Sequence, residues 1–112
     1  MKKQEQEVIN NVCNMYFNRA IAELPRMASC HLNKKQLREA GAVQLNSCQA
    51  WVWDTPNYVV LQSYDTFVAC IPKAVNAVYD VLRMEYGYTH TSSMHIVKFA
   101  RLYGVSNTYT AR

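Results

Sequence analysis

The chain has 112 residues, of which half are hydrophobic and 18% are charged, and its formal net charge is +4. This composition excludes a disordered chain, and the length allows one hydrophobic core but not two ordinary domains. We therefore expect a single domain over residues 1–112, with a helical part over 1–41 and a sheet with a C-terminal helix over 42–112.

The N-terminal part is predicted to contain two helices. Over residues 3–24, apolar side chains recur with the spacing of one helix face, at Val8, Val12, Met15, Phe17, Ile21 and Leu24. Pro25 should end this helix, because the residue before a proline avoids the helical region. A short helix over 34–40 should follow, capped by Asn33 and stopped by Gly41.

From residue 42 onward, short β-prone runs alternate with turn signals. After an alternating start at 43–45, the runs lie at 50–53, 58–61 and 66–71. Their short connections predict a three-stranded antiparallel meander over about 43–71. Because hairpins alone are marginal in water, the N- and C-terminal helices should pack on this sheet in an α+β fold. The expected core residues are Trp51 or Trp53, Val59, Leu61, Val68, Ile96 and Phe99.

Residues 73–86 fit two structures. Val75, Val78 and Leu82 have helical spacing, and the good helix formers around them favour a helix. The β-branched and aromatic residues of 77–82 would also suit a fourth strand.

A C-terminal helix over 92–103 is predicted, with Thr91 or Ser92 as its cap and Gly104 at its end. Its apolar stripe should face the sheet and consists of Ile96, Phe99, Ala100 and Tyr103. Polar residues recur every third position on another side, at Ser92, His95, Lys98 and Arg101. The tail from residue 105 should be irregular.

The four cysteines, Cys13, Cys30, Cys48 and Cys70, are widely spaced and form no Cys-x-x-Cys pair. The polar residues 1–7 do not predict a signal peptide, and the apolar runs are shorter than a membrane span. We expect buried, reduced cysteines and a cytoplasmic protein that does not enter a membrane.

The sequence contains no recognisable catalytic motif. The three histidines, His31, His90 and His95, have no neighbours that form a triad or a zinc spacing, and three glycines do not make a phosphate-binding loop. We therefore expect no enzymatic activity, no metal and no cofactor.

Basic and aromatic residues indicate a binding function. Residues 86–112 carry three basic residues and no acid, so a nucleic acid or an acidic protein surface could be the partner. If 73–86 were a helix, the order helix, Gly87 turn and basic helix would resemble a DNA-binding helix–turn–helix. Trp51 and Trp53 share one strand face, as a core plug or a contact platform. The candidate partner-binding residues are Lys98, Arg101, His95, Ser92, Tyr88, Lys34, Lys35 and Arg38.

Two stretches carry a resemblance to a known family. Residues 61–69 read Leu-Gln-Ser-Tyr-Asp-Thr-Phe-Val-Ala, and Tyr86 to Phe99 contains Thr-Ser-Ser-Met-His-Ile-Val-Lys-Phe. They resemble the pattern L-x-S-Y-x-T-x-V-A, a tyrosine, then T-[TS]-x-x-H-[IV]-x-K-F, of a small domain in phage, prophage and plasmid proteins of gut Firmicutes. The similarity covers the second half of the chain and does not extend to residues 1–43.

The resemblance implies a mobile genetic element as the context. The hypothesis that follows is a small non-enzymatic inhibitor of anti-CRISPR type, which binds a host defence protein or ribonucleoprotein complex. The alternative is a DNA- or RNA-binding accessory protein that uses the basic C-terminal helix.

Overall fold

The computed structural model describes residues 3–29, 31–45 and 49–112. Its helices are α1 (Lys3–Ala22), α2 (Lys34–Glu39), α3 (Leu82–Glu85) and α4 (His90–Leu102). Its strands are β1 (Val43–Gln44), β2 (Ala50–Asp54), β3 (Tyr58–Ser63), β4 (Thr66–Pro72), β5 (Val78–Asp80) and β6 (Thr108–Thr110).

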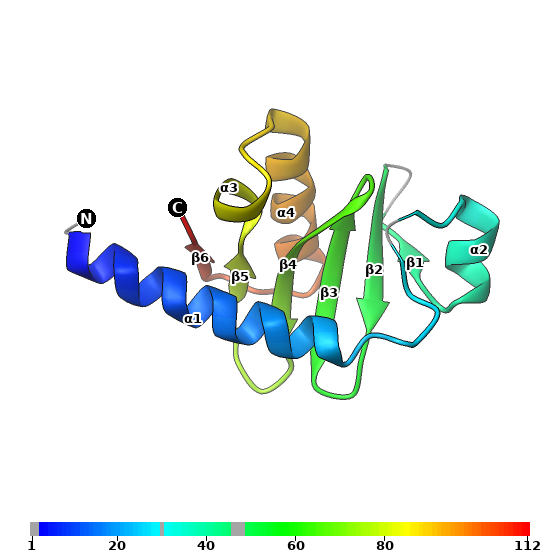
Figure 1. Ribbon diagram of the computed structural model, residues 1–112, viewed down its shortest axis with the longest axis horizontal. Helices are drawn as coiled ribbons and strands as arrows, with labels where there is room; N and C mark the ends of the chain where they lie inside the picture. The colour runs from blue at the N-terminus through cyan, green and yellow to red at the C-terminus, as the bar shows by residue number, and fades with distance from the viewer. Residues whose placement is uncertain (1–2, 30, 46–48) are drawn as a thin grey trace.

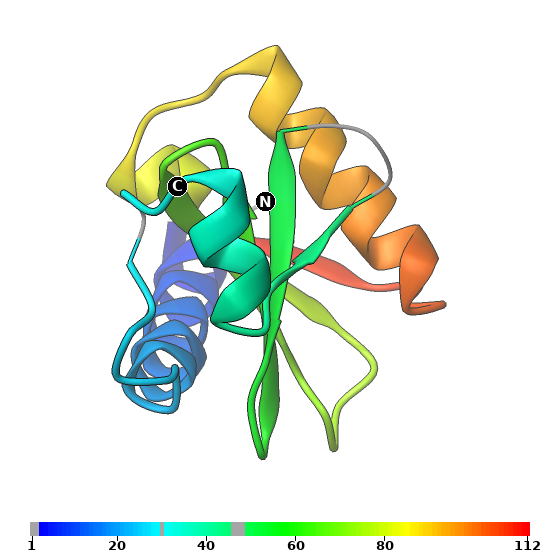
Figure 2. The ribbon, with the colours of Figure 1, turned by 90° about the vertical axis from the view of Figure 1, so that its right-hand side faces the viewer.

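The six strands form one sheet in chain order, between two helical layers. Neighbouring strands pair antiparallel from β1 to β5, and β6 pairs parallel with β5. Helix α1 crosses one face of the sheet and α4 lies on the other, while α2 lies beside β1 (Figures 1 and 2). The expected α+β class is confirmed.

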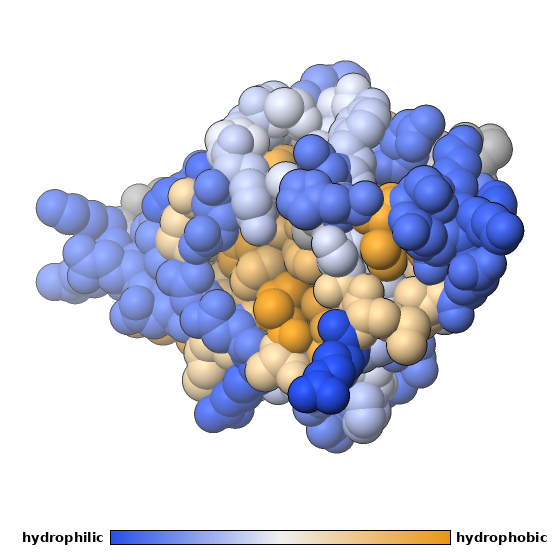
Figure 3. Space-filling model, turned by 45° about the vertical axis from the view of Figure 1, so that its right-hand side comes forward, coloured by the Kyte–Doolittle hydropathy of each residue, from blue (hydrophilic) through white to orange (hydrophobic). Residues whose placement is uncertain are grey.

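The central strands have continuous apolar sequences, and both of their faces are accordingly buried. Because successive side chains point to opposite faces, Trp51 and Trp53 pack with Phe17 under α1, whereas Leu61 packs with Phe99 under α4. All the expected core residues are buried. Both tryptophans belong to the core, so the contact-platform interpretation was wrong. Figure 3 shows one side of the resulting surface, where hydrophilic side chains dominate and apolar ones are visible mainly in a central hollow.

The predicted N-terminal helices are confirmed with small shifts at their ends. Helix α1 ends at Ala22, before Pro25. Helix α2 begins with a capping box, in which the Asn33 side chain accepts from the Gln36 N–H at 2.8 Å and the Gln36 side chain accepts from the Asn33 N–H at 3.0 Å. Such reciprocal bonds satisfy two amide groups that the first turn leaves unpaired.

The predicted three-stranded meander is only the centre of the sheet. Strands β2, β3 and β4 form it, and the structure adds β1 before them and β5 and β6 after them. The preference for a helix over 73–86 was wrong, since this segment contains β5 and the four-residue α3. Burial explains the outcome: Val78 and Tyr79 lie in the cores on opposite faces of the sheet, which a strand allows and a single helix face does not.

The C-terminal tail is not irregular as expected, because Thr108–Thr110 forms β6. Side chains of α1 hold this tail: the Gln6 amide donates to the Thr110 carbonyl at 3.0 Å, and Asn10 donates to the Arg112 carbonyl and accepts from its N–H. These partners are about a hundred positions away along the chain. A local sequence pattern therefore could not predict β6.

Two of the four cysteines lie in the described residues, and both are buried with free thiols. Burial is the main cause that raises the pKa of Cys13 to about 11 and of Cys70 to about 12. Neutral thiols of this kind behave as small apolar side chains, in line with the expected structural role. Cys30 and Cys48 lie outside the described residues.

Asp80 is a buried carboxylate at the end of β5. Its Oδ1 accepts from the Leu82 N–H at 2.8 Å, and its Oδ2 lies 3.5 Å from the Thr110 hydroxyl. Burial raises the pKa of Asp80, and the hydrogen bonds from Leu82 and Thr110 with the charge of Arg83 only partly oppose this. The charged form is therefore the costly one in the folded protein.

We predict that Asp80→Asn raises the unfolding temperature at pH 7, because the amide oxygen still accepts from Leu82 and no buried charge remains. A carboxyl group with a raised folded pKa contributes stability below its unfolded pKa, about 3.9, and this contribution is lost as the pH rises through the folded pKa. The advantage of the variant should therefore shrink towards pH 4. Thermal unfolding at both pH values measures it, with the exposed Glu39→Gln as the control. A variant less stable than the wild type at pH 7 would contradict this assignment.

Candidate binding site at the N-terminus of helix α4

Helix α4 begins two residues earlier than predicted. Thr89 is its N-cap, and the Thr89 hydroxyl accepts from the Ser92 N–H at 3.2 Å. Ser92 is thus in the first turn instead of at the cap. The far end is as expected: the chain leaves the helix through Gly104, whose φ of +64° favours glycine.

A buried polar group joins α4 to the end of β3. The Ser63 hydroxyl lies 2.8 Å from the Ser92 hydroxyl and 2.7 Å from His95 Nδ1. Ser63, Ser92 and His95 are 1%, 6% and 3% exposed. Since buried hydroxyl and imidazole groups are costly when unpaired, these two hydrogen bonds specify where α4 docks on the sheet.

Burial, and then the charge of Lys98, lower the pKa of His95. The neutral ring can satisfy all three groups: Ser92 donates to Ser63, and Ser63 donates to Nδ1. A Ser–His pair at this distance resembles an activated nucleophile. However, the oxygen of Ser63 is below the surface, so we interpret the pair as a positioning contact.

Tyr64 covers this polar group from the β3–β4 turn. Its φ is +54°, which is unusual for a bulky residue. Two hydrogen bonds impose it, because the Tyr64 N–H donates to the Gln49 carbonyl at 2.8 Å and the Gln62 amide donates to the Tyr64 carbonyl at 2.9 Å. The Tyr64 ring is 51% exposed and its centroid lies 5.6 Å from that of His95. Such imposed backbone conformations occur preferentially at functional sites.

A hollow of about 450 Å³ opens between this turn, α3 and the first turn of α4. We call it the α4 hollow. It is lined by Ser63, Tyr64, Asp65, Thr66, Leu82, Tyr86, Gly87, Thr89, Thr91 and Ser92. Beside it, the guanidinium carbon of Arg83 lies 4.4 Å from the centre of the Tyr88 ring.

The outward side of α4 forms a ridge that joins apolar and basic residues. We define the α4 ridge as His90, Met94, Val97, Lys98, Arg101 and Leu102. Met94 and Val97 are 40% and 38% exposed in its middle, and Leu102 is more exposed at its end. Among the residues that the structure describes, the one ion pair joins Lys73 to Asp54, so Lys98 and Arg101 have no carboxylate partner there.

The structure separates the predicted partner-binding residues into three groups. Lys98, Arg101 and Tyr88 are on or beside the surface of α4, as expected. Ser92 and His95 are interior, and the prediction that they share an exposed side with Lys98 and Arg101 was wrong. The reason is that the helix face opposite the ridge, which contains both residues with Ile96 and Phe99, is the one that packs on the sheet. Tyr103, predicted to face the sheet, is partly exposed.

The third group, Lys34, Lys35 and Arg38, lies on α2 beside β1, away from α4 (Figure 2). The guanidinium carbon of Arg38 lies 5.4 Å from the centre of the Trp51 ring. The cations of α2 and α4 therefore do not form one basic surface.

The helix–turn–helix interpretation was wrong. It required a helix before Gly87, where the structure has β5 and a single turn of helix. A four-residue α3 is too short to serve as the first helix of that motif, which crosses the DNA backbone.

The predicted partner-binding residues did not include Ser63, Tyr64 or Asp65. The quoted stretch 61–69 contained all three, but only the fold brings this hairpin turn against the first turn of α4. A serine–tyrosine pair at a turn predicted between two apolar strands was the available signal.

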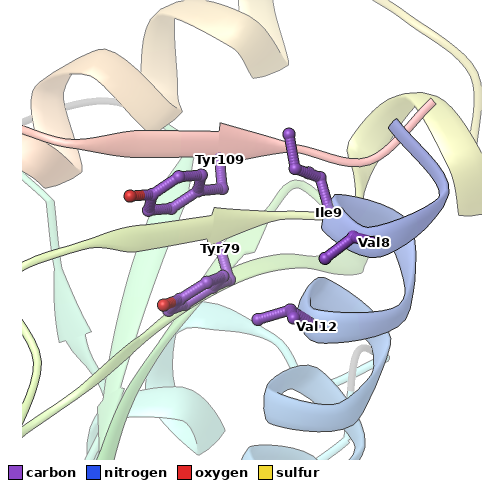
Figure 4. Close-up of a pocket in the computed structure, with 5 residues that line it drawn as sticks. All are labelled: Val8, Ile9, Val12, Tyr79 and Tyr109. Atoms are coloured by element: carbon purple, nitrogen blue, oxygen red, sulfur yellow. The ribbon is translucent and has the colours of Figure 1, made fainter. Parts of the chain in front are cut away.

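A second hollow lies at the opposite layer, between α1 and the edge of the sheet. Its volume is about 210 Å³, and Val8, Ile9, Val12, Tyr79 and Tyr109 line it. The Tyr79 and Tyr109 rings stack with centroids 5.5 Å apart, and the Val8 and Val12 side chains of α1 point towards them (Figure 4). Apart from the two tyrosines, the residues that line it are aliphatic.

Comparisons with protein-family models, with curated proteins and with solved structures found no match to this chain. Across residues 3–29, 31–45 and 49–112, none of the helices is long and apolar enough to cross a membrane. In the same part of the chain, no three His, Cys, Asp or Glu side chains gather as metal ligands would.

We predict that His95→Asn reduces the acid sensitivity of the fold. The pKa of His95 is lower in the folded protein than in the unfolded chain, where it is about 6.5. Neutral His95 therefore stabilises the fold above about pH 6.5, and this stabilisation is lost as the pH falls through the folded pKa. The asparagine side chain can place an acceptor where Nδ1 lies and does not titrate. Chemical denaturation at pH 7.5 and 5 should show a smaller loss for this variant than for the wild type.

The exposed His90→Asn is the matched control and should keep the wild-type loss. His95→Leu should destabilise the protein at both pH values by about 1–3 kcal/mol, because the buried Ser63 hydroxyl loses the acceptor that His95 Nδ1 provides. If His95→Asn lost as much stability in acid as the wild type, His95 would not be the titrating group.

Proposed function

We propose that this protein is a small non-enzymatic binding protein of a phage or other mobile genetic element. It inhibits a host defence complex, in the manner of an anti-CRISPR protein, by binding it through the α4 ridge in the bacterial cytoplasm. The observation that carries the proposal is the ridge itself, in which exposed Met94 and Val97 lie among cations that have no carboxylate partner in the described structure.

The composition of the ridge and its surroundings is that of a protein interface. Methionine, arginine and tyrosine are enriched at such interfaces, and methionine adapts its shape to a partner. Tyr64, Tyr86 and Tyr88 are all exposed at the N-terminal end of α4. The buried hydrogen bonds of Ser63 hold the helix in place before binding, which lowers the entropy cost of association.

The apolar middle of the ridge favours a protein partner over a nucleic acid. Phosphate backbones are bound by cations and polar groups, and Met94 and Val97 would add nothing there. The acid-free composition of residues 86–112 supports the alternative of DNA or RNA binding, in which Lys98 and Arg101 contact phosphates.

The defence context rests on the resemblance to the phage and plasmid domain. Its two stretches pack together here, since Leu61, Val68 and Phe99 share one core and Ser63 bonds to Ser92 and His95. Most residues that carry the resemblance thus position α4, while Lys98 of the same pattern lies on its outer side.

We predict that Lys98→Glu with Arg101→Glu leaves the fold intact and weakens inhibition. Exposed charges contribute at most about 1 kcal/mol to stability, whereas reversal turns attraction to an acidic surface into repulsion. Inhibition of target-DNA cleavage by a purified Firmicutes RNA-guided nuclease should need at least about tenfold more protein, equivalent to about 1.4 kcal/mol.

The control is Arg19→Glu with Arg26→Glu, which changes the net charge equally at exposed residues away from α4. It should inhibit like the wild type. Binding to labelled DNA or RNA that falls steeply with salt, with no effect on the nuclease itself, would support the nucleic-acid alternative. Equal inhibition by both double variants would exclude the ridge.

A further inference from the structure

Helix α1 has a line of side chains along its flank that packing within one chain does not use fully. Its inner side contributes Cys13, Phe17 and Ala20 to the core. A different side carries residues that recur every three or four positions, which is the spacing of helices that pair with one another. We define the α1 stripe as Glu5, Val8, Val12, Met15 and Arg19.

The middle of the α1 stripe is apolar and accessible. Val8 is 61% exposed and Met15 is 39% exposed, and Val12 between them is partly buried. Val8 and Val12 lie beside the hollow between α1 and the edge of the sheet (Figure 4). Single apolar residues on a surface are ordinary. Three of them in line on one helix, next to an apolar hollow, are instead suited to a second helix that lies along the first.

The two ends of the α1 stripe carry opposite charges at equal distances from its centre. Glu5 lies seven positions before Val12 and Arg19 lies seven positions after it, which is about 10.5 Å along the axis in each direction. Both charged residues are exposed, and neither forms an ion pair with a residue that the structure describes. An interface around a two-fold axis presents the same patch from both copies. The stripe is therefore complementary to itself when two copies of the helix run antiparallel.

We infer that α1 packs antiparallel against α1 of a second copy, so that the protein forms a two-fold dimer. Val12 of both copies lies at the axis, and Glu5 of each copy pairs with Arg19 of the other. Met15 of one copy lies at the level of Ile9 of the other, because each is three positions from Val12. Ile9 lines the hollow, and a flexible methionine side chain can fill such an irregular space.

The dimer contact is separate from the proposed inhibitory surface. Helix α1 covers one face of the sheet and α4 covers the other (Figure 2), so a second copy on α1 leaves the α4 ridge accessible. The inference therefore does not rest on the proposed function.

The test is sedimentation equilibrium of the full chain over a range of protein concentrations. The wild type should pass from monomer to dimer as the concentration rises. Glu5→Arg should raise the dissociation constant by about tenfold, because it sets like charges opposite each other at both ends of the interface. Glu5→Arg with Arg19→Glu exchanges the two charges, and should return the dissociation constant to within about threefold of the wild-type value.

Glu7→Arg is the matched control. It makes the same charge change at another exposed glutamate in the first turns of α1, but residues two positions apart do not share a helix side. It should dimerise like the wild type. A wild type that stays monomeric, an assembly larger than a dimer, an equal effect of Glu7→Arg, or no recovery in the exchanged variant would each overturn the inference.

The inhibition test separates the dimer from the proposed function. Arg19→Glu with Arg26→Glu should be monomeric and should still inhibit, because the α4 ridge is unchanged in it. Failure of dimerisation therefore leaves the inhibition result as it is, and failure of inhibition leaves the sedimentation result as it is.

Discussion

The position of α4 depends on one hydroxyl group. Ser63 lies at the end of β3, and its oxygen bonds to both Ser92 and His95 in the interior. Apolar packing of Ile96 and Phe99 would hold the helix on the sheet but would tolerate sliding and rotation, because dispersion and burial have little directionality. Hydrogen bonds that must be made in a buried site do not tolerate either movement. The same contact brings the Tyr64 turn over the helix and thereby forms the α4 hollow.

The sheet provides the rigid base that this contact requires. Side chains of β2, β3 and β4 pack on both faces, against α1 on one side and α4 on the other. The Trp53 indole donates to the buried Gln62 side chain at 3.0 Å, and Gln62 in turn donates to the Tyr64 carbonyl. A continuous set of hydrogen bonds thus runs from the α1 face of the sheet to the turn above α4. The imposed conformation of Tyr64 is stable because its neighbours on both faces are fixed.

A helix with these two sides separates folding from binding. The inner side of α4 carries the serine, histidine and apolar residues that specify its position, and the outer side carries Met94, Val97, Lys98 and Arg101. Substitutions on the outer side change the chemistry offered to a partner with little effect on stability. This division suits the binding role that we propose, because the surface offered to a partner is not the one that holds the helix on the sheet.

Local sequence signals by themselves determined the elements whose causes are local. Pro25 and the Asn33 cap set helix ends, β-prone runs between turn signals identified the strands of the central meander, and Gly104 ended α4. The quoted motifs also contained Ser63, Tyr64 and His95, but they did not predict that these residues are in contact. Tertiary structure alone decided that 78–80 and 108–110 are strands, since each is stabilised by a partner distant along the chain. It also decided that Ser92 and His95 are interior while Lys98 and Arg101 are not, because helical spacing places residues on faces but only packing chooses which face is buried.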